Sequence, residues 1–368
     1  MLLGTMLILF CGCEHAKTVA FENEPSVSTE DTESDSETLE DTGTGTDDTG
    51  NESDSPTDDT ESDNATESET DSDTGEDTES ETDTPLDTES ETDSESELIC
   101  ASASTPITGQ KYVTVGDRTR SYYLRVPGAY SGERPVPLIL DFHTLANTGS
   151  QHSGISIFPG VTDPDGVIIA FPDGLDGPAG TAWNIGECCV NDLENVDDVA
   201  FAKAVVDDVS SMACINPSQV YAVGYIMGGG MAYEVACHAA DVFAAVVSVA
   251  FDLVVSQVTD CAPSRGISEL SYRAVQAMMI PFNGGESQTV SIPGQPVSFL
   301  GAENTMKTWA ELNDCTGTAI DIGGGCSIYP SSQCKDGAEV MLCVDSVNFL
   351  ASGNPVQAWN FLKQHTLK

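Results

Sequence analysis

The chain has 368 residues and a formal net charge of −47, from 60 acidic and 13 basic side chains. An excess of negative charge repels phosphate backbones, so the composition excludes a nucleic-acid-binding protein. The charge is unevenly distributed: residues 1–100 hold 33 acidic and one basic residue, whereas residues 101–368 hold 27 acidic and 12 basic residues, a net charge of −15.

The first thirteen residues predict export. Leu2 to Cys11 is an apolar run of ten residues, which is too short to span a bilayer but suits the core of a signal peptide. Gly12 and Cys13 follow it and resemble the end of a bacterial lipobox, with Cys13 as the lipidated residue. The expectation is a secreted or cell-surface lipoprotein anchored through Cys13; an ordinary cleaved secretory signal is the alternative.

Residues 14–99 consist almost entirely of Asp, Glu, Ser, Thr and Gly. Such a segment has too few apolar side chains to build a core, and its like charges repel each other. It is predicted to be a disordered acidic linker that joins the N-terminal anchor to a folded domain at residues 100–368.

The folded part alternates strand and helix patterns. Residues 111–115 and 121–126 alternate polar and apolar side chains and predict antiparallel edge strands. Continuous apolar runs, as in buried parallel strands, occupy 137–143, 167–172, 220–224, 243–250, 278–282 and 340–344. Helical patterns lie at 197–213, 229–239, 302–312 and 355–365. This order predicts one doubly wound α/β domain.

Ten cysteines lie beyond the signal region, an even number that indicates disulfides in an exported domain. No Cys-x-x-Cys pair occurs, so neither a metal site nor a cofactor is expected. Local closure suggests a bridge from Cys188 or Cys189 to Cys214, and another between Cys237 and Cys261. Two more are expected among Cys315, Cys326, Cys334 and Cys343.

One five-residue turn has the two glycines of a catalytic motif but a different central residue. Gly224-Tyr225-Ile226-Met227-Gly228 matches the Gly-x-Ser-x-Gly elbow, in which the serine attacks an ester carbonyl. Isoleucine at the centre has no proton to lose and forms no acyl-enzyme. Because the elbow residue has a positive φ, which is unfavourable for a β-branched side chain, the turn is expected either to have relaxed or to be strained.

Several segments together resemble the secreted polyhydroxybutyrate depolymerase and feruloyl esterase group, a carbohydrate esterase family 1-like branch of the α/β-hydrolases. They include WNIGECC at 183–189, VDDVAF at 196–201, QVYAVG at 219–224 and AWNF at 358–361. The similarity extends over about residues 108–366 in the same order. It implies an α/β-hydrolase fold with a mostly parallel sheet and a Ser–Asp–His triad in chain order.

Carried over by position, the resemblance leaves every triad position substituted. Ile226 stands at the serine, Ser287 at the acid with Glu286 beside it, and Asn348 at the histidine. For the oxyanion hole, the Met227 amide remains available. Thr144 replaces the glycine that the family has after its first central strand.

Other residues near the expected cleft have structural interpretations. His143 fits the position at which the family keeps a loop-structuring histidine, while Trp183 and Phe349 either line the cleft or pack in the core. Asp197 and Asp198 are expected to organise the loop that carries Trp183.

Three interpretations of the domain follow. The first is a catalytically inactive, lipid-anchored esterase-like protein, whose cleft is either filled or kept to bind a polyester, polysaccharide or small ester. The second is an active secreted ester hydrolase that uses a different set of residues. The third is a structural or adhesive surface protein.

Overall fold

A computed structural model describes Cys100, Cys189 and residues 105–186, 196–277, 279–292, 295–347 and 352–368. The export signal with Cys13 and the acidic linker lie outside the described residues. So do Cys188, Asn348 and Phe349, three residues that the sequence marked as candidates for the disulfides or the site.

A ten-stranded sheet forms the centre of the domain, in the order β1-β2-β4-β3-β7-β8-β9-β14-β13-β12. Its six middle strands pair in parallel. They are β4 (Ile168–Pro172), β3 (Val136–Phe142), β7 (Ile215–Tyr225), β8 (Ala245–Val249), β9 (Ser268–Ala274) and β14 (Val340–Asp345). Strands β4 and β8 are buried at every position, which explains their continuous apolar sequences.

Antiparallel strands complete both ends of the sheet. β1 (Gly109–Val115) and β2 (Arg118–Arg125) form a hairpin, and β2 also pairs antiparallel with β4, as the alternating sequence predicted. At the opposite end, β13 (Cys326–Tyr329) pairs antiparallel with β14 and with β12 (Ile320–Gly323). This second hairpin was not predicted, because its strands are short and β12 is exposed throughout.

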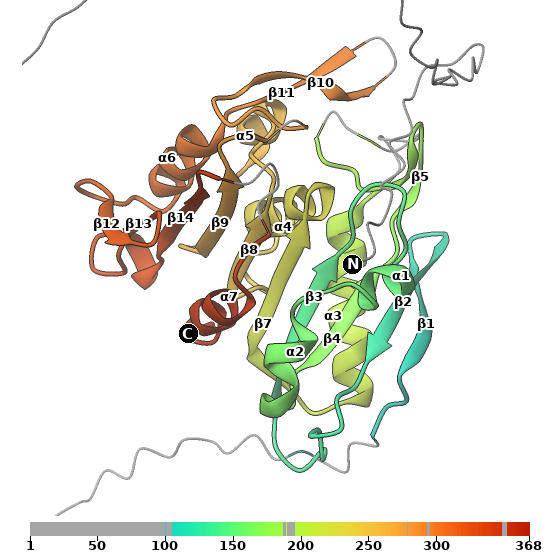
Figure 1. The fold of residues 1–368 in the computed structure, drawn as a ribbon. Coiled ribbons are helices and arrows are strands. Elements are labelled where there is room, and N and C mark those ends of the chain that lie inside the picture. Colours follow the sequence, from blue (N-terminus) through green and yellow to red (C-terminus); the bar gives the residue numbers. More distant parts are fainter. Residues whose placement is uncertain are drawn as a thin grey trace, which may run out of the picture. The chain divides into compact units, whose positions relative to one another are not determined.

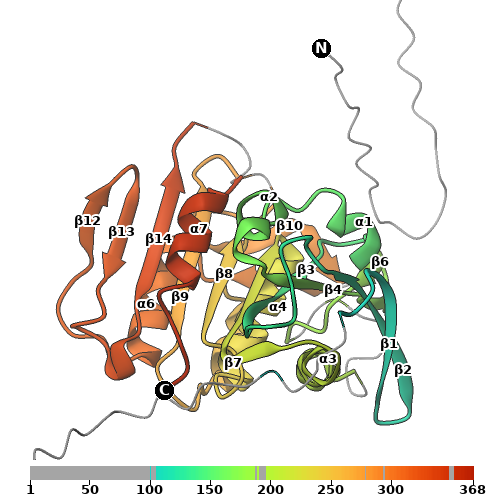
Figure 2. The same ribbon diagram turned by 90° about the horizontal axis from the view of Figure 1, so that it is seen from below.

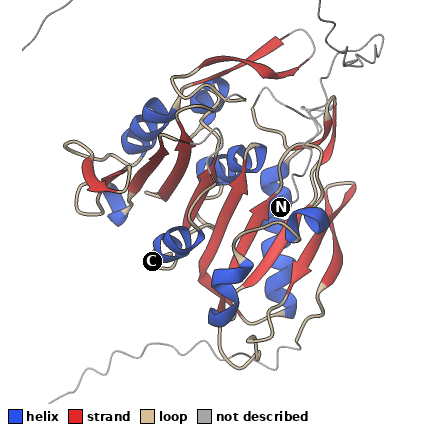
Figure 3. Ribbon diagram, viewed as in Figure 1, coloured by secondary structure: helices blue, strands red, loops and turns tan. Residues whose placement is uncertain are grey.

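Helices cover both faces of the sheet, in the layers visible in Figures 1 and 2. α3 (Asp198–Met212), α4 (Met227–His238) and α6 (Ala302–Leu312) lie on one face. α2 (Pro159–Thr162) and α7 (Pro355–Leu362) lie on the other. The remaining helical segments are short: α1 (Gly149–Ser153), η1 (Asp163–Asp165), α5 (Val255–Asp260) and η3 (Lys335–Gly337). Helices and strands alternate along the chain, as predicted for an α/β fold (Figure 3).

Local sequence fixes where the longer helices begin. The Asp197 carboxylate accepts the Ala200 N–H at the start of α3. The Asn354 side chain accepts the Gln357 N–H at the start of α7, where Pro355 occupies the first turn. Such side chains satisfy backbone donors that have no partner within the helix.

Two small sheets stand apart from the central one. β5 (Leu175–Gly177) pairs with β6 (Gly180–Ala182), and β10 (Gly285–Ile292) pairs with β11 (Gln295–Phe299). Figure 1 shows both beyond the carboxyl ends of the central strands, where α/β proteins place their sites.

The predicted strand at 278–282 is wrong. Residues 279–282 form bends and turns, and the strand beside β8 is β9, which comes earlier in the chain. β9 was missed because Glu269 and Arg273 interrupt its apolar pattern, although both side chains are buried.

Disulfides join distant parts of the domain. Cys237–Cys261 forms as expected, and the four C-terminal cysteines form Cys315–Cys334 and Cys326–Cys343. The predicted partner of Cys214 is wrong: Cys214 bonds to Cys100. Cys189 is itself disulfide-bonded; it precedes the 15-residue helix α3, and Cys214 follows that helix. Within the described part of the chain, no helix is both long and apolar enough to cross a membrane.

Candidate functional site

The turn after β7 keeps the geometry of a nucleophile elbow. Ile226 follows the last residue of β7, has φ 52° and ψ −115°, and directly precedes α4. Its N–H donates to the Val249 carbonyl at 2.8 Å, and its own carbonyl accepts the Gly229 N–H at 2.8 Å. The side chain is only 6% exposed. Of the two outcomes expected, the turn is therefore strained and has not relaxed.

Glycines around the elbow allow three backbone segments to pack closely. A Cβ atom at Gly224 would lie 2.0 Å from the carbonyl carbon of Gly228, and one at Gly228 would lie 1.9 Å from the Phe142 carbonyl oxygen. No side chain fits at either position, so these glycines are needed for packing whether or not the turn carries a nucleophile.

The elbow lacks a reactive atom. The Ile226 side chain is a hydrocarbon, which neither attacks a carbonyl nor accepts a proton. Met227 begins α4, so its amide lies at the positive end of the helix dipole, where an oxyanion would be stabilised. The Met227 amide thus has the placement of an oxyanion-hole donor, next to a hydrocarbon side chain at position 226.

His143 lies directly after β3 and is fully buried. Its Nε2 accepts the Gly174 N–H at 2.9 Å, and its Nδ1 donates to the Thr144 carbonyl at 2.6 Å. Burial lowers the pKa of His143 to about 4. Both ring nitrogens are hydrogen-bonded to the backbone, and the lowered pKa favours the neutral ring, so His143 links the end of β3 to the segment at Gly174.

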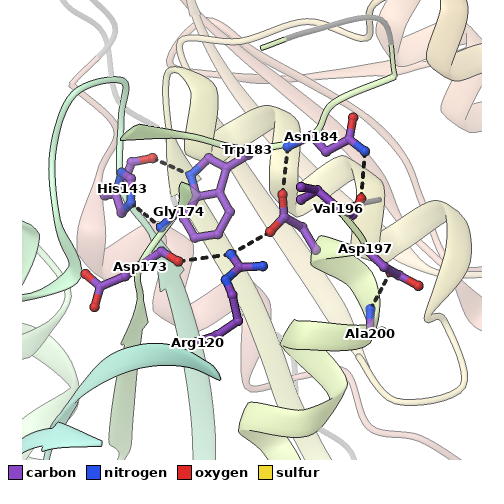
Figure 4. Close-up of polar contacts among 10 residues, drawn as sticks. Arg120, His143, Asp173, Gly174, Trp183, Asn184, Val196, Asp197 and Ala200 are labelled. Carbon is purple, nitrogen blue, oxygen red and sulfur yellow. Dashed lines mark hydrogen bonds and ion pairs between the residues drawn. The ribbon is translucent and has the colours of Figure 1, made fainter. Parts of the chain in front are cut away.

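Trp183 is a core residue that fixes this loop (Figure 4). Its indole N–H donates to the His143 carbonyl at 2.8 Å, and its ring lies 4.7 Å from the His143 ring and 5.2 Å from that of Phe142. With no exposed surface, Trp183 contacts no ligand. Of its two predicted roles, packing is the one that the structure supports.

A buried ion pair holds the neighbouring segment. Arg120 on β2 (Figure 4) donates to the Asp198 carboxylate at 2.7 Å. Its guanidinium also lies over the Phe201 ring, 4.0 Å from the centroid. The second oxygen of Asp198 accepts the Asn184 N–H at 2.7 Å. Asp198 therefore contacts the segment after Trp183, as the sequence indicated, whereas the side chain of Asp197 caps α3.

The acid position has to be reassigned. Ser287 lies on β10, where its hydroxyl donates to the Met279 carbonyl at 2.6 Å, and Glu286 beside it is exposed. The parallel strand next to β8 ends at Ala274, so the catalytic acid of this fold would follow Ala274. Residues 275–277 are Val, Gln and Ala. The inferred placement of the acid was wrong because the strand was misplaced, yet the corrected loop also carries no carboxylate.

A cavity of about 390 Å³ lies further along the same edge. It borders the carboxyl ends of β9 and β14, the turn between β12 and β13, and the start of α7. Its lining includes Tyr272, Asp345, Asn354 and Gln357 but none of Ile226, Met227, His143 and Trp183. Sequence reasoning missed this cavity, because its lining residues come from four separate elements.

Among the described residues, no group of three or more His, Cys, Asp or Glu side chains is arranged to hold a metal ion.

Comparison with known proteins relates the chain to esterases. Feruloyl esterase B of Piromyces equi is 37% identical over 253 residues, which cover 67% of this chain and 46% of that protein. Probable feruloyl esterase C of Aspergillus oryzae is 34% identical over 248 residues, covering 66% of this chain and 83% of that protein. The putative esterase NocK of Nocardia uniformis is 32% identical over 191 residues, 50% of this chain and 53% of its own. The chain thus spans about half the length of the first and third of these relatives.

No protein-family model matches the chain. One comparison with a solved structure bears on the fold. The structure of an acetyl xylan esterase from Aspergillus awamori superposes with a TM-score of 0.51 and 12% sequence identity, covering 69% of this chain and 99% of that one. At that identity the likeness supports a shared α/β fold and carries no information about substrate.

Proposed function

The chain belongs to the feruloyl esterase family of α/β-hydrolases, and we propose that its esterase-like domain is catalytically inactive. Ile226 carries the proposal: a buried hydrocarbon occupies the strained elbow position that a serine nucleophile requires. Loss of the nucleophile alone reduces turnover by about a million-fold in a Ser–His–Asp enzyme.

The neighbouring groups offer no replacement for the missing chemistry. His143 is neutral, buried and bonded through both ring nitrogens. The loop after β9, residues 275–277, has no carboxylate. Acyl transfer needs a nucleophile activated by a base, and the described residues at this edge supply neither in a usable arrangement.

The proposal extends to the place where the domain acts. The apolar run before Cys13 supports export and lipid anchoring, and the acidic segment 14–99 supports a spacer that holds the domain away from the membrane. The domain would then bind a polymer or an ester without turning it over. If the full chain is produced in a bacterial host, it should fractionate with membranes, and C13S should release it.

An ester assay with a covalent probe tests the inactivity directly. The purified protein is expected to leave a short-chain nitrophenyl ester unhydrolysed and to resist labelling by a fluorophosphonate. Ile226→Ser should restore neither turnover nor labelling, because no described residue places a base beside the new hydroxyl; Ile226→Val is the matched control. Turnover by the unmodified protein that the fluorophosphonate abolishes would disprove the proposal and favour an active hydrolase with a different site.

A further inference from the structure

A buried polar cluster connects α4 to β9 on the face of the sheet opposite α7. Glu269 on β9 is fully buried, and the Tyr233 hydroxyl of α4 donates to its Oε1 at 3.2 Å. Ser271, two residues further along β9, contacts the same oxygen and lies 2.8 Å from the Tyr233 hydroxyl. We call these three residues the α4–β9 cluster.

Among the residues that the structure describes, no cationic side chain pairs with Glu269. Arg273 on the same strand pairs with Asp252 at 3.0 Å, with both side chains fully buried, and also donates to the Ile280 carbonyl. From α6, the neutral ring of Trp309 lies 5.6 Å from the Tyr233 ring. Asp252, which Arg273 holds, acts on Glu269 with a charge of the same sign and raises the pKa of Glu269. Burial raises the pKa of Asp252 itself to about 7, and Arg273 opposes that shift.

The acidic side chain of α4, Glu234, does not contact Glu269 and has partners of its own. Glu234 follows Tyr233 but is bonded to Gln257 at 2.8 Å, and its other oxygen lies 3.5 Å from the His238 ring. Within the described part of the chain, Oε2 of Glu269 has no hydrogen-bond partner. A buried carboxylate with no cation and one unpartnered oxygen is far less stable than the neutral acid.

We propose that Glu269 is a protonated acid in the folded protein and that the α4–β9 cluster is a proton-dependent latch which alkaline pH opens. Protonation lets Glu269 share hydrogen bonds with Tyr233 and Ser271 at no cost in buried charge. Ionisation places a second negative charge beside Asp252 and weakens the packing of α4 against β9. Because α4 begins at the elbow, the latch controls how firmly the elbow helix is held. The inference does not depend on whether Ile226 abolishes catalysis.

The direction of the pH dependence follows from the two states of Glu269. Burial is the main cause that raises its pKa, to about 8, with Asp252 adding to the shift, while the two hydroxyl groups oppose it. The unfolded chain ionises near 4.5. Between these values the folded state holds a proton that the unfolded state has lost. This contribution to stability is complete below about 4.5 and is lost as the pH rises through about 8.

Urea unfolding of the whole protein at a series of pH values tests the latch. Between pH 5.5 and 7.5, the slope of the logarithm of the folding constant against pH gives the number of protons taken up on folding. Glu269→Gln, which mimics the neutral acid, should reduce that uptake by about one proton. Glu311→Gln, at an exposed position on α6, should leave it unchanged. An unchanged uptake in E269Q would overturn the proposal.

Infrared spectroscopy detects the protonated carboxyl group directly and does not depend on a measured change in the stability of the protein. With ¹³C-labelled glutamate, protonated side-chain carbonyl absorption should be present at pH 6.5 and lost by pH 10. Burial raises the pKa of Glu234 to about 7, so Glu234 also absorbs at pH 6.5, and E269Q should lose the Glu269 component while keeping that of Glu234. Tyr233→Phe removes a hydroxyl that favours the ionised form, so the loss of the Glu269 component should move to higher pH. If E269Q does not fold, this shift decides: a Glu269 component that stays in place in Y233F, or no such component at pH 6.5, refutes the latch.

Discussion

Because the backbone at Ile226 is strained, glycine at this position should give a more stable protein than alanine, the reverse of the order of stability at most positions. At φ 52° and ψ −115° a non-glycine residue costs about 1–3 kcal/mol, which glycine avoids. Glycine itself loses about 0.5–1 kcal/mol more backbone entropy than alanine on folding. Ile226→Ala and Ile226→Gly remove nearly the same buried side chain, so these two terms decide the difference. The difference between the two ranges runs from about 0 to 2.5 kcal/mol, so the glycine variant should be more stable by roughly 1 kcal/mol, the middle of that span.

Thermal or urea unfolding of the two variants measures this difference. Each kcal/mol corresponds to about 2–4 °C in midpoint for a domain of this size. Ala204→Gly, in the interior of α3, is the control and should destabilise by about 1 kcal/mol, the usual cost of glycine in a helix. An I226A protein as stable as I226G would show that the elbow residue is not held at a positive φ, and the argument from strain would fail.

Two further predictions concern residues that hold the site together. Arg120→Ala should destabilise the fold by about 3–5 kcal/mol in urea unfolding, because it leaves Asp198 buried and unpaired. Lys203→Ala, which breaks the exposed pair with Asp241, should change stability by less than about 1 kcal/mol, and equal effects of the two variants would contradict the assignment. The His143 ring should stay neutral in an NMR titration down to about pH 5, since its pKa is lowered to about 4. Because the folded value lies below the unfolded one, this group should cost stability as the pH falls from about 6.5 towards 4, and titration of the ring near pH 6.5 would refute its burial.

Sequence patterns predicted most of the parallel sheet but failed where charge lies inside it. The runs that became β3, β4, β7 and β8 are apolar enough for central strands. β9 contains Glu269 and Arg273, whose charges suggest surface positions when only the sequence is considered. In the folded domain Glu269 contacts Tyr233 and Ser271, and Arg273 pairs with Asp252. One misplaced strand then moved the acid position from the loop after Ala274 to Ser287.

For the disulfides too, the sequence predicted the pairs close together in the chain but not the distant one. Cys237–Cys261 was predicted from proximity in sequence. The bond from Cys214 to Cys100 spans 114 residues, and proximity favoured Cys188 or Cys189, which precede α3. Proximity along the chain therefore does not decide which cysteine meets Cys214, whose partner comes from the far end of the folded domain's sequence.

The sequence by itself determined the family resemblance and the absence of a serine at the elbow, because both depend on which residue occupies a numbered position. It also established the alternation of strands and helices, which follows from local periodicity and capping. Only the tertiary structure decided that the turn at Ile226 remains strained, that both nitrogens of His143 are occupied, and that Glu269 lies in a cluster without a cation. These properties depend on distances between segments far apart in the chain, and burial changes the charge and hydrogen bonding of a side chain in ways that its neighbours in sequence do not reveal.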